Sequence, residues 1–146
     1  MYPDQAPFKA DLEACFLPDQ ELADSVDGFV AALEKKDWTT VIATIKKFVP
    51  SVSKDIQPCE TPQYQKVDDA YHDEQKLVET VKADPDFQAK MGKQAFMHMK
   101  DLKSNMADFQ AKWDSGDYYG SGVAIGNIEM IIMKPWMNSY EGEFLQ

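Results

Sequence analysis

A histidine between two methionines is the group in this sequence that most resembles a metal site. The three residues are Met97, His98 and Met99. Thioether and imidazole groups are ligands that soft metal ions such as copper accept. In a helix, however, consecutive side chains point about 100° apart around the axis, so these three cannot converge on one ion. We therefore expect the methionines to fill gaps in a core, and we expect no bound metal or other cofactor.

A second group combines a carboxyl and an imidazole. Glu74 falls on the apolar side of one expected helix, and His98 lies beside the apolar seam of the next. If these helices pack antiparallel, the two side chains could meet as a general acid and base. We favour the alternative, a structural hydrogen bond, because the sequence supplies no nucleophile. Ser115 and Ser121 lie beside glycines but lack the Gly-x-Ser-x-Gly turn that exposes a catalytic serine. We expect no enzymatic activity.

Five segments have the apolar spacing of amphipathic helices, and none has the alternation of a strand. Proline is tolerated in the first turn of a helix, and aspartate or threonine caps it. The expected starts are Pro18, Trp38 after Asp37, Thr61-Pro62, Asp84-Pro85 and Asp117. We expect Pro50 to kink or end the second helix. The fourth helix is expected to be long, with a seam formed by Ala95, Met99, Leu102, Met106, Phe109 and Trp113.

The fifth helix, residues 118–133, is apolar nearly all round. It is too short, and too interrupted by Asn127 and Glu129, to cross a bilayer, so other helices should wrap it. We expect an all-α fold in which about five helices form a bundle around this central C-terminal helix. We expect six residues at the start of this helix to have structural roles in capping, packing or close contact between helices. They are Gly116, Asp117, Tyr118, Tyr119, Gly122 and Gly126.

The length and net charge of the chain limit the number of domains and the classes of partner. With 146 residues and 44% hydrophobic content, one core is the default. We expect an extended arm over 1–17, a helical domain over 18–134 and a tail over 135–146. The 25 acidic and 15 basic side chains give a net charge of −10. This charge repels phosphate backbones, so we expect no nucleic-acid partner. Because the apolar helix over 118–133 is too short and interrupted to span a bilayer, we also expect no transmembrane segment.

Two cysteines, Cys15 and Cys59, flank the first two expected helices. A disulfide between them would close a loop of about 45 residues and stabilise the fold by about 4 kcal/mol on the chain-entropy estimate. Paired cysteines are typical of secreted and lumenal proteins. Two buried free thiols are the alternative. A cytoplasmic protein would also fit the N-terminus, which lacks the basic start and apolar run of a signal peptide.

The order of these features resembles that of a large group of small secreted helical proteins of ciliate protists. The marks are Cys15, the break Lys36-Asp37-Trp38, Cys59, and the segment Gly116-Asp117-Tyr118-Tyr119-Gly120-Ser121-Gly122-Val123-Ala124-Ile125-Gly126. The likeness spans most of residues 15–133 and transfers no established activity. It implies a secreted, disulfide-linked product, found extracellularly or in a vesicle lumen, whose leader has been removed.

Two classes of function fit these features. The first is a noncatalytic structural or interaction module that self-associates or contacts another protein. Its exposed aromatics would be Tyr2, Phe8, Trp136 and Phe144. The second is a carrier of a lipid or other small hydrophobic molecule in the bundle core. Its lining would be Met99, Leu102, Met106, Ile125, Ile128 and Met130. We favour the first, because methionines and aromatics fill a core as readily as they line a cavity.

Overall fold

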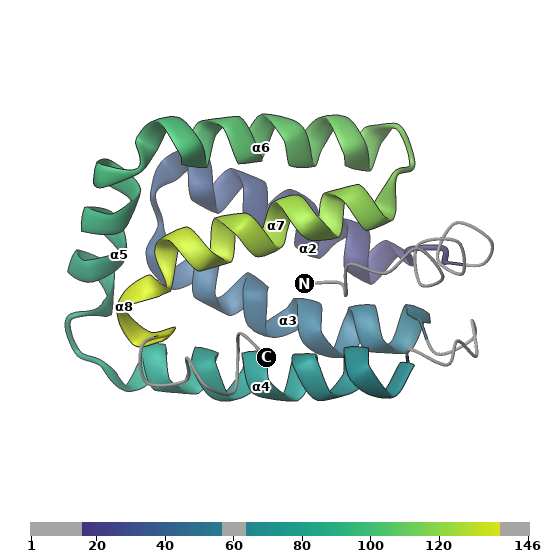
Figure 1. The fold of residues 1–146 in the computed structure, drawn as a ribbon, viewed down its shortest axis with the longest axis horizontal. Helices are drawn as coiled ribbons and strands as arrows, with labels where there is room; N and C mark the ends of the chain where they lie inside the picture. Colours follow the sequence, from purple (N-terminus) through teal and green to yellow (C-terminus); the bar gives the residue numbers. More distant parts are fainter. Residues whose placement is uncertain (1–15, 57–63, 138–146) are drawn as a thin grey trace.

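The computed structural model describes residues 16–56 and 64–137, and the regular structure within these ranges is entirely α-helical. This confirms the all-α class. Seven helices are present in the described ranges, where the sequence predicts about five (Figure 1). They are α2 (Gln20–Lys35), α3 (Trp38–Ile56), α4 (Tyr64–Ala83), α5 (Phe87–Met97), α6 (Met99–Asp114), α7 (Tyr118–Ile132) and α8 (Lys134–Met137).

Two helical hairpins provide the frame. One consists of α2 and α3, the other of α6 and α7, and α4 packs along α3. Helix α5 runs across one end and links α4 to α6, while α7 lies in the middle of the view in Figure 1. The core is apolar and includes an edge-to-face contact between Phe29 of α2 and Phe48 of α3, with ring centroids 5.3 Å apart.

Polar caps set the ends of the first hairpin. Asp19, one residue after the predicted start at Pro18, accepts a hydrogen bond of 2.9 Å from the N–H of Leu22. Helix α2 ends at Lys36, whose φ of 57° is left-handed. Asp37 then accepts a hydrogen bond of 3.3 Å from the N–H of Thr40 and caps α3 as predicted. The chain reverses direction within two residues.

The second hairpin turns in the same way. Gly116 has a φ of +83°, a conformation that glycine adopts without the steric cost of a Cβ. The next residue, Asp117, accepts a hydrogen bond of 2.9 Å from the N–H of Gly120 and caps α7. Both residues therefore have the capping roles that the sequence predicts.

The predicted fourth helix is divided. It breaks at His98 (φ −120°, ψ 31°) into α5 and α6, which run in different directions (Figure 1). The break allows α5 to bury Met91 and Ala95 at the end of the molecule while α6 buries Leu102 and Phe109 along its side. The prediction of a single long helix is therefore wrong.

Pro50 does not end the second helix. Helix α3 continues past it to Ile56. Proline removes the hydrogen bond to the carbonyl four residues earlier, that of Lys46, and both residues are exposed. Water can therefore satisfy the freed carbonyl group.

Trp136, expected as an exposed aromatic of the tail, is buried with 6% of its surface exposed. It belongs to α8, and its Nε1 donates a hydrogen bond of 3.0 Å to Oδ2 of Asp84 in the α4–α5 turn. The same Oδ2 lies 2.6 Å from Nζ of Lys90. This contact fixes the end of the described chain to a turn more than fifty residues earlier, so Trp136 cannot serve as a surface contact.

Helix α7 is less enclosed than predicted. Most of its residues are buried, but Val123 and Met130 are 37% and 47% exposed. These two residues and the exposed Asn127 lie on one face of the helix because their spacing is four and three. No helix in the described ranges has the length and apolar character needed to cross a membrane.

Candidate functional site

An apolar groove lies between the end of α2 and the start of α6. Leu33 comes from the last turn of α2, Trp38 begins α3, and Met99 begins α6. The volume is about 260 Å³. We call this site the α2–α6 groove; its lining consists of Leu33, Glu34, Lys36, Trp38, Ala95, Met99, Leu102, Lys103 and Met106.

Two local features position the walls of the α2–α6 groove. The N–H of Lys36 donates to the carbonyls of Ala32 and Leu33, and this left-handed turn directs the chain into Trp38. Gly92 of α5 faces the indole, because a Cβ built there would lie 3.3 Å from Nε1 of Trp38. The absence of a side chain at Gly92 therefore lets α5 approach Trp38 closely.

The rim of the α2–α6 groove is charged. Lys36 and Lys103 contribute ammonium groups and Glu34 contributes a carboxylate, so two positive charges and one negative charge leave a net charge of +1. Neither lysine forms an ion pair with another described residue. An apolar floor with unpaired cations at its edge is suited to binding an apolar or amphipathic molecule.

The structure divides the six residues that we expected to line a ligand site. Met99, Leu102 and Met106 lie together in the α2–α6 groove. Ile125 lines a different cavity, and Ile128 is fully buried in the core. Met130 lies on the exposed face of α7. The side chains that were expected to form one chamber therefore lie in separate places.

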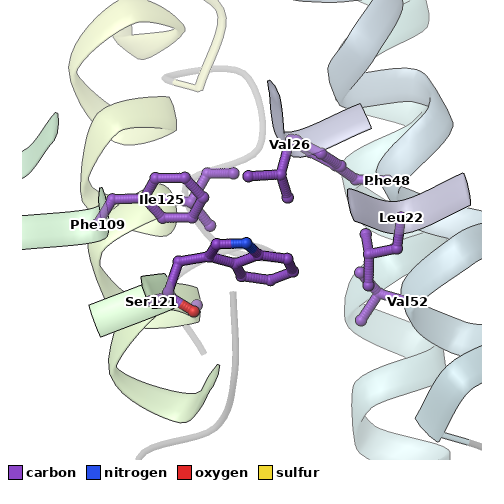
Figure 2. A pocket seen from close by; sticks show the side chains of 9 residues that line it. Leu22, Val26, Phe48, Val52, Phe109, Ser121 and Ile125 are labelled. Atoms are coloured by element: carbon purple, nitrogen blue, oxygen red, sulfur yellow. The ribbon is translucent and has the colours of Figure 1, made fainter. Parts of the chain in front are cut away.

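The cavity at Ile125 lies between the two hairpins. Figure 2 shows Phe109, Ser121 and Ile125 on one side of it and side chains of α2 and α3 on the other. Its volume is only about 20 Å³, and its lining consists of Leu22, Val26, Phe48, Val52, Phe109, Trp113, Ser121, Gly122 and Ile125. A cavity of this size holds about one water molecule, so it has no room for a lipid.

The remaining residues with predicted structural roles lie around the α6–α7 turn. Tyr118 packs edge-on against Trp113, with ring centroids 5.2 Å apart, and against Phe16 at 5.6 Å. Tyr119 is half-buried against the core. Gly122 is buried at the small cavity, and Gly126 is half-buried. Cys15 and Cys59 lie outside the described residues, so their disulfide stays a prediction.

Two glutamates form the most unusual polar feature of the interior. Glu74 of α4 is 4% exposed and Glu129 of α7 is 7% exposed. Their carboxyl groups lie within hydrogen-bond range of each other, but Oε1 of each has no hydrogen-bond partner among the described residues. No lysine among the described residues forms an ion pair with either group. Burial and the mutual repulsion of two adjacent carboxylates both favour the protonated form of the pair.

The electrostatics of this pair follow from burial. Loss of solvation raises the pKa of the Glu74 carboxyl, against a smaller opposing effect of its hydrogen bond with Glu129. Loss of solvation, and next the charge of Glu74, raise the pKa of Glu129 well above its usual value. The pair therefore keeps a proton at a pH where an exposed glutamate has lost it.

Sequence reasoning missed the role of Glu129, which we treated only as an interruption of an apolar helix. The available signal was its spacing: Ile125, Glu129 and Ile132 are separated by four and three residues and share the buried face of α7. The acid–base partner considered for Glu74 was His98. His98 lies at the α5–α6 junction, at the end of α5 remote from α4 (Figure 1).

The methionine–histidine group does not form a ligand set. Met97 is 53% exposed, whereas Met99 faces the α2–α6 groove and His98 occupies the break between two helices. Within residues 16–56 and 64–137, no three histidine, cysteine, aspartate or glutamate side chains lie close enough together to hold a metal ion.

Comparisons with known proteins give no relative for this arrangement. No family model, curated protein or solved structure matches the chain.

Proposed function

We propose that this chain is a noncatalytic binding protein whose α2–α6 groove carries a small hydrophobic molecule. In this proposal the helices act as one bundle around α7, which provides a rigid frame for the groove. The observation that carries the proposal is the groove itself. The groove has a volume of about 260 Å³ and an apolar floor. Met99, Leu102 and Met106, three of the residues expected to contact a ligand, line it.

The size of the groove limits the ligand. An apolar cavity of about 150 Å³ in another protein holds benzene, and the α2–α6 groove is larger at about 260 Å³. Typical sites for drug-sized ligands begin at about 300 Å³. We therefore propose a ligand with a ring system or a single short chain. A two-chain phospholipid would leave most of its apolar surface in water.

A binding assay with an uncharged probe tests this proposal. N-phenyl-1-naphthylamine fluoresces strongly only in apolar surroundings, and we expect the protein to bind it with saturation. The variant Met99→Gln/Met106→Gln should weaken binding about tenfold, because it replaces apolar contacts by polar groups. Native mass spectrometry of gently purified protein should also retain a bound small molecule.

Met130→Gln is the matched control. It makes the same chemical change at an exposed methionine outside the groove, so probe binding should be unchanged. Absence of saturable binding to the wild-type protein would contradict the proposal. Equal weakening by the control variant would show that the probe binds elsewhere.

The structural or interaction module is the second candidate. Phe96 and Met97, at the α5–α6 corner, are 79% and 53% exposed, and such apolar side chains can contact a second chain. The aromatics on which the idea first rested give less support, since Trp136 is buried and Tyr2, Phe8 and Phe144 lie outside the described residues. The α2–α6 groove therefore favours the carrier.

Light scattering with size-exclusion chromatography at several protein concentrations tests the second candidate. If the corner mediates self-association, the wild-type mass should rise with concentration and Phe96→Ser should remain monomeric. A constant monomeric mass for both proteins would remove self-association.

We also propose a secreted or vesicle-lumen location. It rests on the resemblance to the secreted ciliate proteins and on the two cysteines. A cytoplasmic location is the alternative.

A further inference from the structure

We infer that the α2–α6 groove selects a single-chain amphiphile with an anionic head group, such as a medium-chain carboxylate. The inference rests on the proposed function and adds the chemical class of the ligand. The apolar chain would lie on Leu33, Trp38 and Leu102, and the head group would lie at the rim beside Lys36 and Lys103.

The first support is the unpaired state of the two rim lysines. Lys46, Lys54, Lys90 and Lys112 each lie within ion-pair distance of a carboxylate. Lys36 and Lys103, like several other surface lysines, have no such partner among the described residues, although the chain has ten more negative than positive charges. Their ammonium groups are therefore available to an anion.

The second support is the position of the lysines relative to the apolar floor. They come from opposite walls, Lys36 from the turn after α2 and Lys103 from the second turn of α6. We place the anion at the rim near these ammonium groups, with its chain on the apolar floor. Lysine places a charge at the end of an apolar stem, which suits the edge of a groove.

The start of α6 adds a smaller favourable effect. Met99 is both the first residue of α6 and part of the groove, and the side chain of the preceding His98 does not cap the helix. The uncapped N–H groups give this end a partial positive charge. Asp101 in the first turn opposes the effect, so the two lysines provide the main attraction.

Glu34 limits the charge of the ligand. It is the only carboxylate among the described residues of the lining, and it reduces the net charge of the rim to +1. A monoanion therefore matches the groove better than a dianion. Glu34 also allows a test of the ligand's charge, because removal of this carboxylate should strengthen the binding of an anion.

The experiment compares decanoate with 1-decanol, which has the same chain and no charge, below the concentration at which decanoate forms micelles. Displacement of N-phenyl-1-naphthylamine gives both affinities. The wild-type protein should prefer decanoate about fivefold, as two partly exposed charge contacts allow. Lys36→Gln/Lys103→Gln should abolish the preference for decanoate over decanol. Glu34→Gln should increase the preference about twofold.

The matched control is Lys47→Gln/Lys134→Gln, which removes two exposed lysines outside the groove and changes the net charge equally. It should keep the preference. Equal binding of decanoate and decanol to the wild-type protein would overturn the inference of an anionic head group but would not contradict the carrier proposal. Equal loss in the control would also overturn it, because attraction would then be nonspecific. If neither compound nor the uncharged probe binds, both proposals fail.

Discussion

Glu74 and Glu129 place two acidic side chains in an apolar interior without a described cation. A buried carboxylate is costly, and two adjacent ones repel each other. The fold tolerates the pair because one proton can join the two groups. These two residues therefore make the stability of the protein dependent on pH.

We predict that stability falls as the pH rises from 5 to 8. A carboxyl group whose pKa is raised in the folded state binds more protons when folded than when unfolded. Its stabilising contribution is complete at a pH below the unfolded pKa and is lost as the pH rises through the folded pKa. The free energy of unfolding, measured with urea, should therefore decrease steadily over this range.

Glu129→Gln should reduce this pH dependence and stabilise the protein at pH 8, because the amide can donate a hydrogen bond to Glu74 without titrating. Glu79→Gln is the control, since Glu79 is 61% exposed in its ion pair with Lys46. The pKa values of Asp19, Asp37 and Asp84 are lowered by hydrogen bonds, so their contributions are lost only below pH 3.8. Equal slopes for Glu129→Gln and wild type would contradict this account.

At the scale of the helices, the ends of the two hairpins depend on local chemistry. The cap at Asp117 and the left-handed Gly116 could be predicted from the sequence because each acts within a few residues. The break at His98 could not be predicted. The apolar spacing continues across it without glycine or proline, and only the packing of α5 and α6 against different neighbours requires it.

Two glycine substitutions should have opposite effects on stability. Gly116→Ala should destabilise the protein by about 1 kcal/mol, because a Cβ disfavours a φ of +83°. Gly28→Ala, in the interior of α2, should stabilise it by about 0.5 kcal/mol, since the new Cβ would lie at an ordinary contact distance of 3.5 Å from Thr44. Urea unfolding at one pH measures both. The same sign for the two variants would disprove the assignment.

At the scale of the whole molecule, the sequence predicts the helical class but not the candidate site. Met99 and Leu102 could be recognised as apolar seam residues, but their contact with Leu33 at the groove depends on how α6 lies beside α2. The Glu74–Glu129 pair likewise joins residues far apart in the chain. Such long-range placement depends on the packing of all helices together, which no local pattern encodes.

The sequence also predicts a covalent bond between distant parts of the chain. Intact mass spectrometry after alkylation without reductant should show no modified cysteine if Cys15 and Cys59 are joined. Reduction should then lower the free energy of unfolding by up to about 4 kcal/mol, the chain-entropy estimate for this loop. Alkylation of both cysteines in the unreduced, unfolded protein would support the cytoplasmic alternative.

The hydrogen bond between Trp136 and Asp84 affects how the polypeptide can be shortened or extended. Because the indole and Lys90 meet one carboxylate oxygen, the backbone reaches Met137 from a fixed site beside the α4–α5 turn. A fluorophore or affinity tag joined after α8 would therefore start from a rigid attachment point. Cutting the chain back to Met133 would strip an aromatic ring from the interior and leave an apolar hole open to water.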